Sequence, residues 1–197
     1  MQLKINGQPV DVTLENEKTV GDVLKSFESE AAKNDATTVA IWLNGREISA
    51  DKFDDAAAEA LTDNTEIDLN VISKHDIIES FKDIAAQFSS LTEKLNDVPV
   101  QLQSGKDREA SATITALATE VDTFCHMAAL SALFPDLYNA LIIDGKNLND
   151  FFKEFSPILS DFESAMEVKD TVTVGDLSEY EIGPRLKSIS EVLTKFN

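Results

Sequence analysis

Cysteine and histidine are scarce in this sequence, and glycine never clusters, so several classes of site are excluded. The single cysteine, Cys125, excludes an intrachain disulfide, and together with two histidines it cannot form the clusters that zinc requires. The seven glycines are scattered singly, so the chain contains no phosphate-binding glycine-rich loop. A Gly-x-Ser-x-Gly nucleophile elbow is also absent. We therefore expect no metal, no cofactor and no nucleophilic catalysis, and we expect Cys125 to be a small buried core residue beside Phe124 and Met127.

Basic residues are outnumbered two to one, with 17 lysines and arginines against 36 aspartates and glutamates and a net charge of −19. Both nucleic acid and anionic membranes attract basic surfaces, so neither is an expected partner. The acidic excess is spread along the chain: residues 1–73 carry 6 basic and 15 acidic side chains, and residues 74–197 carry 11 and 21. Such a surface keeps a protein soluble, and it also suits a basic protein partner.

Long hydrophobic runs are missing as well, and no apolar stretch approaches the ~18 residues that a membrane span needs. The longest uncharged stretch, Thr123–Pro135, is short and contains threonine, serine and histidine. The first residues, Met1-Gln2-Leu3-Lys4, do not form the basic and apolar regions of a secretory signal. We therefore expect a cytoplasmic protein. Its 197 residues, 43% of them hydrophobic, are enough to bury a sizeable core.

The hydrophobic period changes near residue 73, which predicts two domains, residues 1–73 and 74–197. In the first domain, Thr19 and Asp22 form a capping box ahead of a helix, and Asn6-Gly7 is a strong hairpin signal. Alternating apolar residues predict four strands, around residues 3–5, 10–14, 39–43 and 67–71.

This order of hairpin, helix, strand, turn and final strand resembles the β-grasp fold, and specifically its ubiquitin-like form. The resemblance covers about 73 residues and is carried by Met1-Gln2-Leu3, by Leu43-Asn44-Gly45-Arg46-Glu47-Ile48 and by the segment 61–69. It implies a protein-binding module. A conjugated ubiquitin ends in Gly-Gly, whereas this chain has no Gly-Gly pair and continues through Ser73 into the second domain. We therefore expect neither a conjugated modifier nor a sulfur carrier.

From Ser73 onward the apolar spacing is helical, and Ser73 with Asp76 forms a second capping box. Four principal helices are expected, hence a helical bundle and an α+β protein overall. A short helix is predicted over residues 137–143, and the last helix is expected to start between Thr173 and Asp176. Interruptions are predicted at residues 97–99, 104–106, 144–146 and 183–184.

Three residues of the first domain are candidates for protein interaction: Trp42, Asn70 and Lys4. Strand alternation places Trp42 between Ile41 and Leu43, on the sheet face opposite the helix. In the ubiquitin resemblance, Trp42 aligns with the centre of an aliphatic recognition patch and Asn70 with another of its positions, so the patch itself is not reproduced. An exposed tryptophan is a frequent binding hot spot. The alternative is that Trp42 packs against the helical domain.

The absent catalytic signatures and the β-grasp resemblance together favour a non-enzymatic adaptor or assembly protein with an unidentified protein partner. The phenylalanine-rich segment 151–162 either fills the core or extends across a subunit interface, and we expect a homodimer. Two other functions remain open. One is a secretion or motility chaperone that cradles an amphipathic helix, and the other is an enzyme with a carboxylate pair between the domains.

Overall fold

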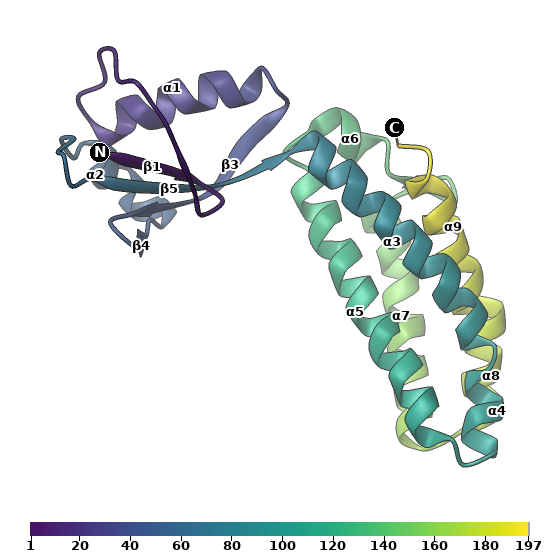
Figure 1. Ribbon diagram of the computed structural model, residues 1–197. Coiled ribbons are helices and arrows are strands. Elements are labelled where there is room, and N and C mark those ends of the chain that lie inside the picture. The colour runs from purple at the N-terminus through teal and green to yellow at the C-terminus, as the bar shows by residue number, and fades with distance from the viewer. Residues whose placement is uncertain (197) are drawn as a thin grey trace. The chain divides into compact units, whose positions relative to one another are not determined.

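The computed structural model describes residues 1–196 and separates into two compact units, Met1–Asp76 and a second that begins at Ile77 (Figure 1). The first unit contains a mixed sheet with a helix, and the second is largely helical. The expected α+β class is therefore confirmed in its coarse form.

The first unit is built around a five-stranded sheet in the order β2-β1-β5-β3-β4. The central strands β1 and β5 run parallel, and the other neighbouring strands are antiparallel. The elements are β1 (Gln2–Ile5), β2 (Gln8–Val10), α1 (Val20–Ala32), β3 (Ala36–Leu43), β4 (Arg46–Glu47), η1 (Ala50–Lys52), α2 (Phe53–Ala57) and β5 (Glu66–Ser73).

Two Asn-Gly turns brace the central strand β5. Asn6 and Asn44 have φ of 51° and 52°, and the glycine that follows each has a similarly positive φ, as a two-residue type I′ hairpin turn requires. The Asn6 amide bonds both backbone groups of Val71, accepting from its N–H at 2.8 Å and donating to its carbonyl at 3.1 Å. The Asn44 side chain accepts from the Glu66 N–H at 3.0 Å. Both ends of β5 are thus fixed by turn residues.

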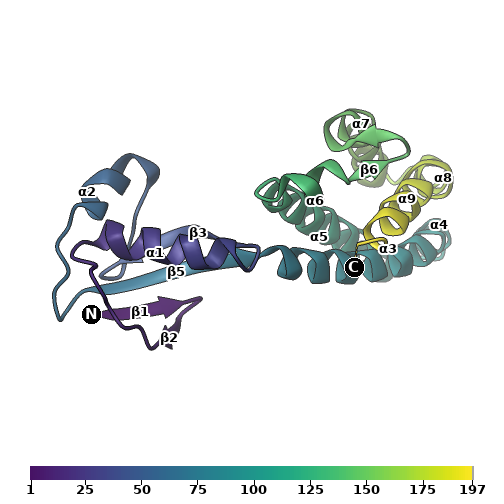
Figure 2. The ribbon, with the colours of Figure 1, turned by 90° about the horizontal axis from the view of Figure 1, so that it is seen from above.

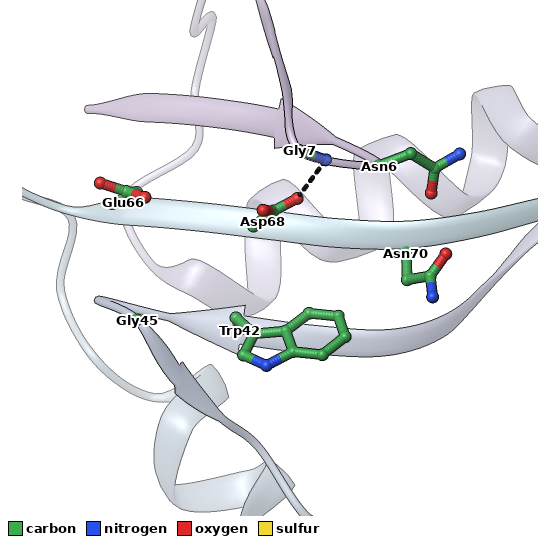
Figure 3. Close-up of a pocket in the computed structure, with 7 residues that line it drawn as sticks. All are labelled: Asn6, Gly7, Trp42, Gly45, Glu66, Asp68 and Asn70. Atoms are coloured by element: carbon green, nitrogen blue, oxygen red, sulfur yellow. Dashed lines mark hydrogen bonds between the residues drawn. The ribbon is translucent and has the colours of Figure 1, made fainter.

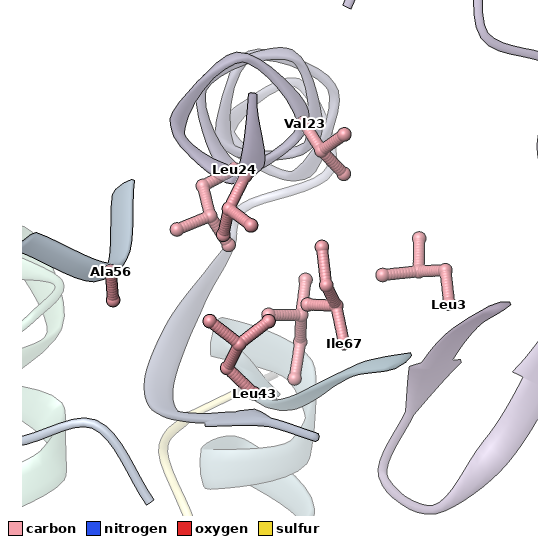
Figure 4. Close-up of a cluster of buried hydrophobic side chains, with 8 residues drawn as sticks. Leu3, Val23, Leu24, Leu43, Ala56 and Ile67 are labelled. Atoms are coloured by element: carbon pink, nitrogen blue, oxygen red, sulfur yellow. The ribbon is translucent and has the colours of Figure 1, made fainter. Parts of the chain in front are cut away.

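The core of this unit lies between α1 and one face of the sheet. Leu3 and Leu43 are paired in register with Ile67 on either side of it, and all three are buried (Figure 4). They pack in one cluster with Val23 and Leu24 of α1. The predicted capping box begins that helix, because Thr19 accepts from the Asp22 N–H and Asp22 accepts from the Thr19 N–H.

The expected second strand is wrong beyond residue 10. β2 ends at Val10, and Val12 and Leu14 lie outside the sheet with 43% and 41% of their surface exposed. Glu17 gives the reason, because its carboxylate accepts from the Glu15 N–H at 2.8 Å and from the Ser26 hydroxyl of α1 at 2.8 Å. These bonds hold the segment against α1 rather than beside β1. The hydroxyl of Ser26 and the backbone N–H groups lower the pKa of Glu17 to about 2.

The second unit consists of long helices joined by short turns, and Figures 1 and 2 show α3, α5, α7 and α9 side by side. Its elements are α3 (Lys74–Leu95), α4 (Val98–Gln103), α5 (Asp107–Ser131), α6 (Pro135–Asn139), β6 (Ile142–Ile143), β7 (Lys146–Asn147), α7 (Leu148–Glu167), α8 (Thr171–Asp176), the π-helix η2 (Leu177–Ile182) and α9 (Gly183–Leu193). The capping box ahead of α3 is confirmed, since Asp76 and Ser73 each accept from the other's backbone N–H.

Phenylalanines fill the centre of this unit. Phe88 of α3 meets Phe124 of α5 edge-on, with ring centroids 5.9 Å apart, and both are fully buried. Phe152 of α7 stacks on Phe124, also with ring centroids 5.9 Å apart. Phe151 and Phe155 of α7 are buried as well. The phenylalanine-rich segment therefore belongs to the core of the unit.

Two local expectations in this unit are wrong. The helix expected over residues 137–143 ends at Asn139, and Ile142–Ile143 instead form a hairpin with Lys146–Asn147. Asp144 and Gly145 both have positive φ, as the two central residues of a type I′ hairpin turn do. Cys125 is exposed rather than buried. Phe124 is buried in the core, and the next residue of a helix points about 100° away from it. The side chain of Cys125 therefore points away from the core.

The last helix also differs from its expected form. It begins earlier, at Thr171, where Asp170 accepts from the Thr173 N–H at 3.1 Å. It is not interrupted at Gly183-Pro184 but passes through the π-helix η2 into α9. Proline has no N–H to donate and its ring crowds the preceding turn, so a wider turn accommodates it.

Candidate interaction surface

A row of polar and aromatic side chains crosses the sheet on the face away from α1. Asp68 of β5 is paired in register with Lys4 of β1 on one side and with Trp42 of β3 on the other. Each of these residues neighbours a core residue along its strand, and successive side chains alternate between faces. We call the face that carries Lys4, Trp42, Glu66, Asp68 and Asn70 the outer sheet face.

The centre of the outer sheet face is a shallow pocket of about 480 Å³. Figure 3 shows the side chains of Trp42 on β3 and of Asp68 and Asn70 on β5, with the two Asn-Gly turns at the edge of the pocket. Two of the three predicted residues, Trp42 and Asn70, therefore line one pocket. The pocket is lined by Asn6, Gly7, Trp42, Gly45, Glu66, Asp68 and Asn70.

Lys4, the third predicted residue, lies beside the pocket and pairs with one of its carboxylates. Its ammonium nitrogen is 2.6 Å from Oε1 of Glu66, and both side chains are partly exposed. The hydrogen bond to Glu66, reinforced by the charges of Glu66 and Asp68, raises the pKa of Lys4 above its usual value. Lys4 is therefore cationic at neutral pH, and its charge balances that of Glu66.

Asp68 differs from Glu66, because the Asp68 carboxylate has no ion-pair partner among residues 1–196. Its Oδ1 accepts a hydrogen bond from the Gly7 N–H at 3.2 Å, which orients the carboxylate at the pocket wall. Glu47 of β4 is exposed and paired in register with Trp42, so it lies on the same face. The outer sheet face thus carries three carboxylates against one lysine.

The aromatic and amide groups of the pocket are available for contacts. Trp42 is half-buried and Asn70 is exposed. Within the described residues, neither the indole N–H of Trp42 nor the side-chain amide of Asn70 has a hydrogen-bond partner. Asp68 is not among the residues predicted from the sequence, although it lies between Ile67 and Leu69 and so shows the same alternation that placed Trp42.

A second groove of the first unit, about 660 Å³, lies between α1, β3 and α2 and is mainly apolar. Val39 and Phe53 are its exposed large hydrophobic residues, at 39% and 41%. Beside it, the edge of β3 is capped, because Glu28 accepts from the Thr38 N–H at 2.8 Å. Such capping prevents an edge strand from pairing with another chain. Its lining also includes the charged side chains Lys25 and Glu28 beside the aromatic Phe53, but no tryptophan.

Other kinds of site have no candidate in the described part of the chain. No group of three or more histidine, cysteine, aspartate or glutamate side chains is placed to hold a metal ion among residues 1–196. No aspartate or glutamate in that range is buried. Within the same residues, every helix is too short or too polar to cross a membrane.

Comparison with known proteins assigns both parts of the chain to families. A family model described as the TP0873 N-terminal domain matches residues 1–73, and one described as a domain of unknown function, DUF8042, matches residues 79–192. A protein of Treponema pallidum (strain Nichols), named only as uncharacterized, is 32% identical over 191 residues, which cover 97% of this chain and 95% of that protein. No solved structure matches the chain. The chain therefore belongs to the DUF8042 family and carries a TP0873-type N-terminal domain ahead of its DUF8042 domain.

Proposed function

We propose that this chain is a non-enzymatic adaptor or assembly protein whose N-terminal unit binds a partner protein through the outer sheet face. We further propose that this unit is a ubiquitin-like β-grasp module and that the second unit is a helical bundle. The strand order β2-β1-β5-β3-β4, with α1 packed on one face, supports the first assignment. The side-by-side arrangement of α3, α5, α7 and α9 supports the second (Figure 2).

The observation that carries this proposal is the position of Trp42. It is half-buried at a shallow pocket on a face that α1 does not cover, and no described residue accepts from its indole N–H. Tryptophan offers a large apolar surface and a polar N–H at little cost in conformational entropy, and it is enriched among binding hot spots. A partner that covers this face can pack on the apolar surface of the indole and accept a hydrogen bond from its N–H.

A chaperone that cradles an amphipathic helix is the second candidate, and one observation favours it. Val100 of α4, Val168 after α7 and Val172 of α8 are exposed at 65%, 76% and 68%. α4 and α8 are in contact, so these valines belong to neighbouring elements. Apolar groups that are exposed together mark binding surfaces. The carboxylate-pair enzyme ranks last, because residues 1–196 bury no aspartate or glutamate.

Capture from a lysate of the organism that makes the protein tests the proposed function. The full chain is immobilised as wild type, as Trp42→Asp, and as the control Phe53→Asp, which likewise replaces a solvent-accessible aromatic residue by aspartate but in α2. We expect a near-stoichiometric partner on the wild type and on Phe53→Asp. Loss of a hot spot costs about 2 kcal/mol, or about 30-fold in affinity, so Trp42→Asp should lose the partner.

Circular dichroism checks that both variants are folded. If the same partner is captured equally by all three proteins, the outer sheet face is not the binding surface and the helical unit takes that role. If none of the proteins captures a partner, the adaptor proposal is wrong. The outer sheet face could instead bind a second copy of the chain. In that case sedimentation would show a dimer for the wild type and a monomer for Trp42→Asp.

A further inference from the structure

The pocket of the outer sheet face combines an aromatic wall with a carboxylate that the protein itself leaves without an ion pair. Trp42 and Asp68 are directly opposite each other on β3 and β5, so their side chains lie side by side (Figure 3). The volume of about 480 Å³ is sufficient for one long side chain of a partner. We propose that this pocket binds an arginine side chain of the partner protein, an inference that rests on the proposed function.

The local charges determine the sign of the bound group. Lys4 pairs with Glu66 at 2.6 Å and also interacts electrostatically with Asp68, so this single lysine faces the three carboxylates of Glu66, Asp68 and Glu47 and the face keeps a net negative charge. The whole chain reinforces this local charge with its net −19. A cationic group is attracted over distance and is bound at the pocket, whereas an anionic group is repelled in both steps.

The geometry favours arginine over lysine. A guanidinium group is planar and stacks on an indole face, and its N–H groups form a fork that matches a carboxylate. Oδ1 of Asp68 is held by the Gly7 N–H at 3.2 Å, so the carboxylate is already oriented. The free amide of Asn70, adjacent on the same strand face, supplies a further acceptor. A lysine ammonium can also lie over the indole face, but it lacks the planar fork that stacks on the ring and pairs with the carboxylate at the same time.

Trp42 also provides the means of measurement, because it is the single tryptophan of the chain. Its fluorescence, and its one indole signal in an amide NMR spectrum, report on this pocket alone. The full chain is titrated with acetyl-Gly-Arg-Gly-amide and with the matched citrulline peptide, which has the same shape without the charge. We expect a saturable change with the arginine peptide and about tenfold weaker binding of the citrulline peptide, because charge-assisted bonds are lost.

A pair of variants tests the role of Asp68. Asp68→Asn removes the charge but keeps an oxygen that accepts from the Gly7 N–H. Glu59→Gln changes the net charge by the same amount at an exposed position outside the pocket. We expect Asp68→Asn to bind the arginine peptide about fivefold to tenfold more weakly and Glu59→Gln to bind it like the wild type.

The possible results separate this inference from the proposed function. Equal affinity for the arginine and citrulline peptides, or for an acetyl-Gly-Lys-Gly-amide peptide, would overturn the arginine assignment. If Trp42→Asp loses its captured partner while the arginine peptide fails to perturb Trp42, the proposed function stands and the inference fails. If the arginine peptide binds as expected while capture is unchanged in Trp42→Asp, the pocket is confirmed and the proposed function fails.

Discussion

Replacing Phe88 with alanine is expected to lower the free energy of unfolding of the helical unit by about 3–5 kcal/mol. Phe88 is fully buried on α3, and its ring meets that of Phe124 edge-on at 5.9 Å. The substitution removes the apolar contacts of a whole ring and leaves a cavity. Phe124 is itself held by Phe152, so the surrounding rings are not free to collapse into the space. This is among the largest losses that a single substitution in this unit should cause.

Denaturant unfolding followed by far-UV circular dichroism measures this effect, since helices dominate that signal. Gln87→Ala, at the preceding and exposed position of α3, is the matched control and should change stability by no more than about 0.5 kcal/mol. Trp42 lies in the first unit, so its fluorescence follows that unit separately. A loss below 1 kcal/mol for Phe88→Ala would contradict the described core.

Replacing Ile67 with alanine is expected to destabilise the first unit by about 2–5 kcal/mol. Ile67 is fully buried in the central strand β5, paired in register with Leu3 on one side and Leu43 on the other. A domain of 76 residues has a total stability of about 4–11 kcal/mol. The substitution therefore removes a large share of that stability, and it also loosens the strand that presents Asp68 and Asn70 on the opposite face.

The fluorescence of Trp42 measures this change directly. The unfolding midpoint of the first unit should fall in Ile67→Ala, while Asn70→Ala, an exposed position of the same strand, should leave it nearly unchanged. Far-UV circular dichroism of both variants should retain the helical signal of the second unit. Unchanged fluorescence midpoints in Ile67→Ala would show that the row of Leu3, Ile67 and Leu43 is not the centre of the core.

Local signals in the sequence predicted the fold well wherever a short segment determines its own structure. The capping boxes of Thr19 with Asp22 and of Ser73 with Asp76 are both formed, and the Asn6-Gly7 hairpin is present. Each needs only residues that are three or fewer positions apart. The same holds for the stripe of α3, whose apolar residues recur at helical spacing and are buried.

The errors occur where another interaction overrides the spacing of the apolar residues. Val12 and Leu14 alternate like a strand, but Glu17 holds their segment against α1 by accepting from Ser26. Residues 142–143 have a helical spacing with the residues before them, but the left-handed turn at Asp144 pairs them into a hairpin. The Asp144-Gly145 signal is local and could have been recognised, whereas a single sequence contains no direct record of the contact between Glu17 and Ser26.

The candidate site was predicted only in part, because local signals placed Trp42 but not the charges around it. Alternation along β3 is a local property, so it placed Trp42 on the face away from α1. The partnership of Lys4 with Glu66 joins residues 62 positions apart and depends on the parallel pairing of β1 with β5. That pairing determines which charge is neutralised and which remains, and it follows from the whole sheet rather than from any single strand.

Photo-crosslinking tests whether a partner protein contacts the outer sheet face, because it detects the contact itself. Gln2, exposed and paired in register with Glu66, is replaced by p-benzoylphenylalanine in the full chain, and Ser29 of α1 is replaced in the same way as the control. We expect a crosslink to one other protein from position 2, abolished by Trp42→Asp, and none from position 29. The same crosslink from position 29 alone, or none from position 2, would contradict it.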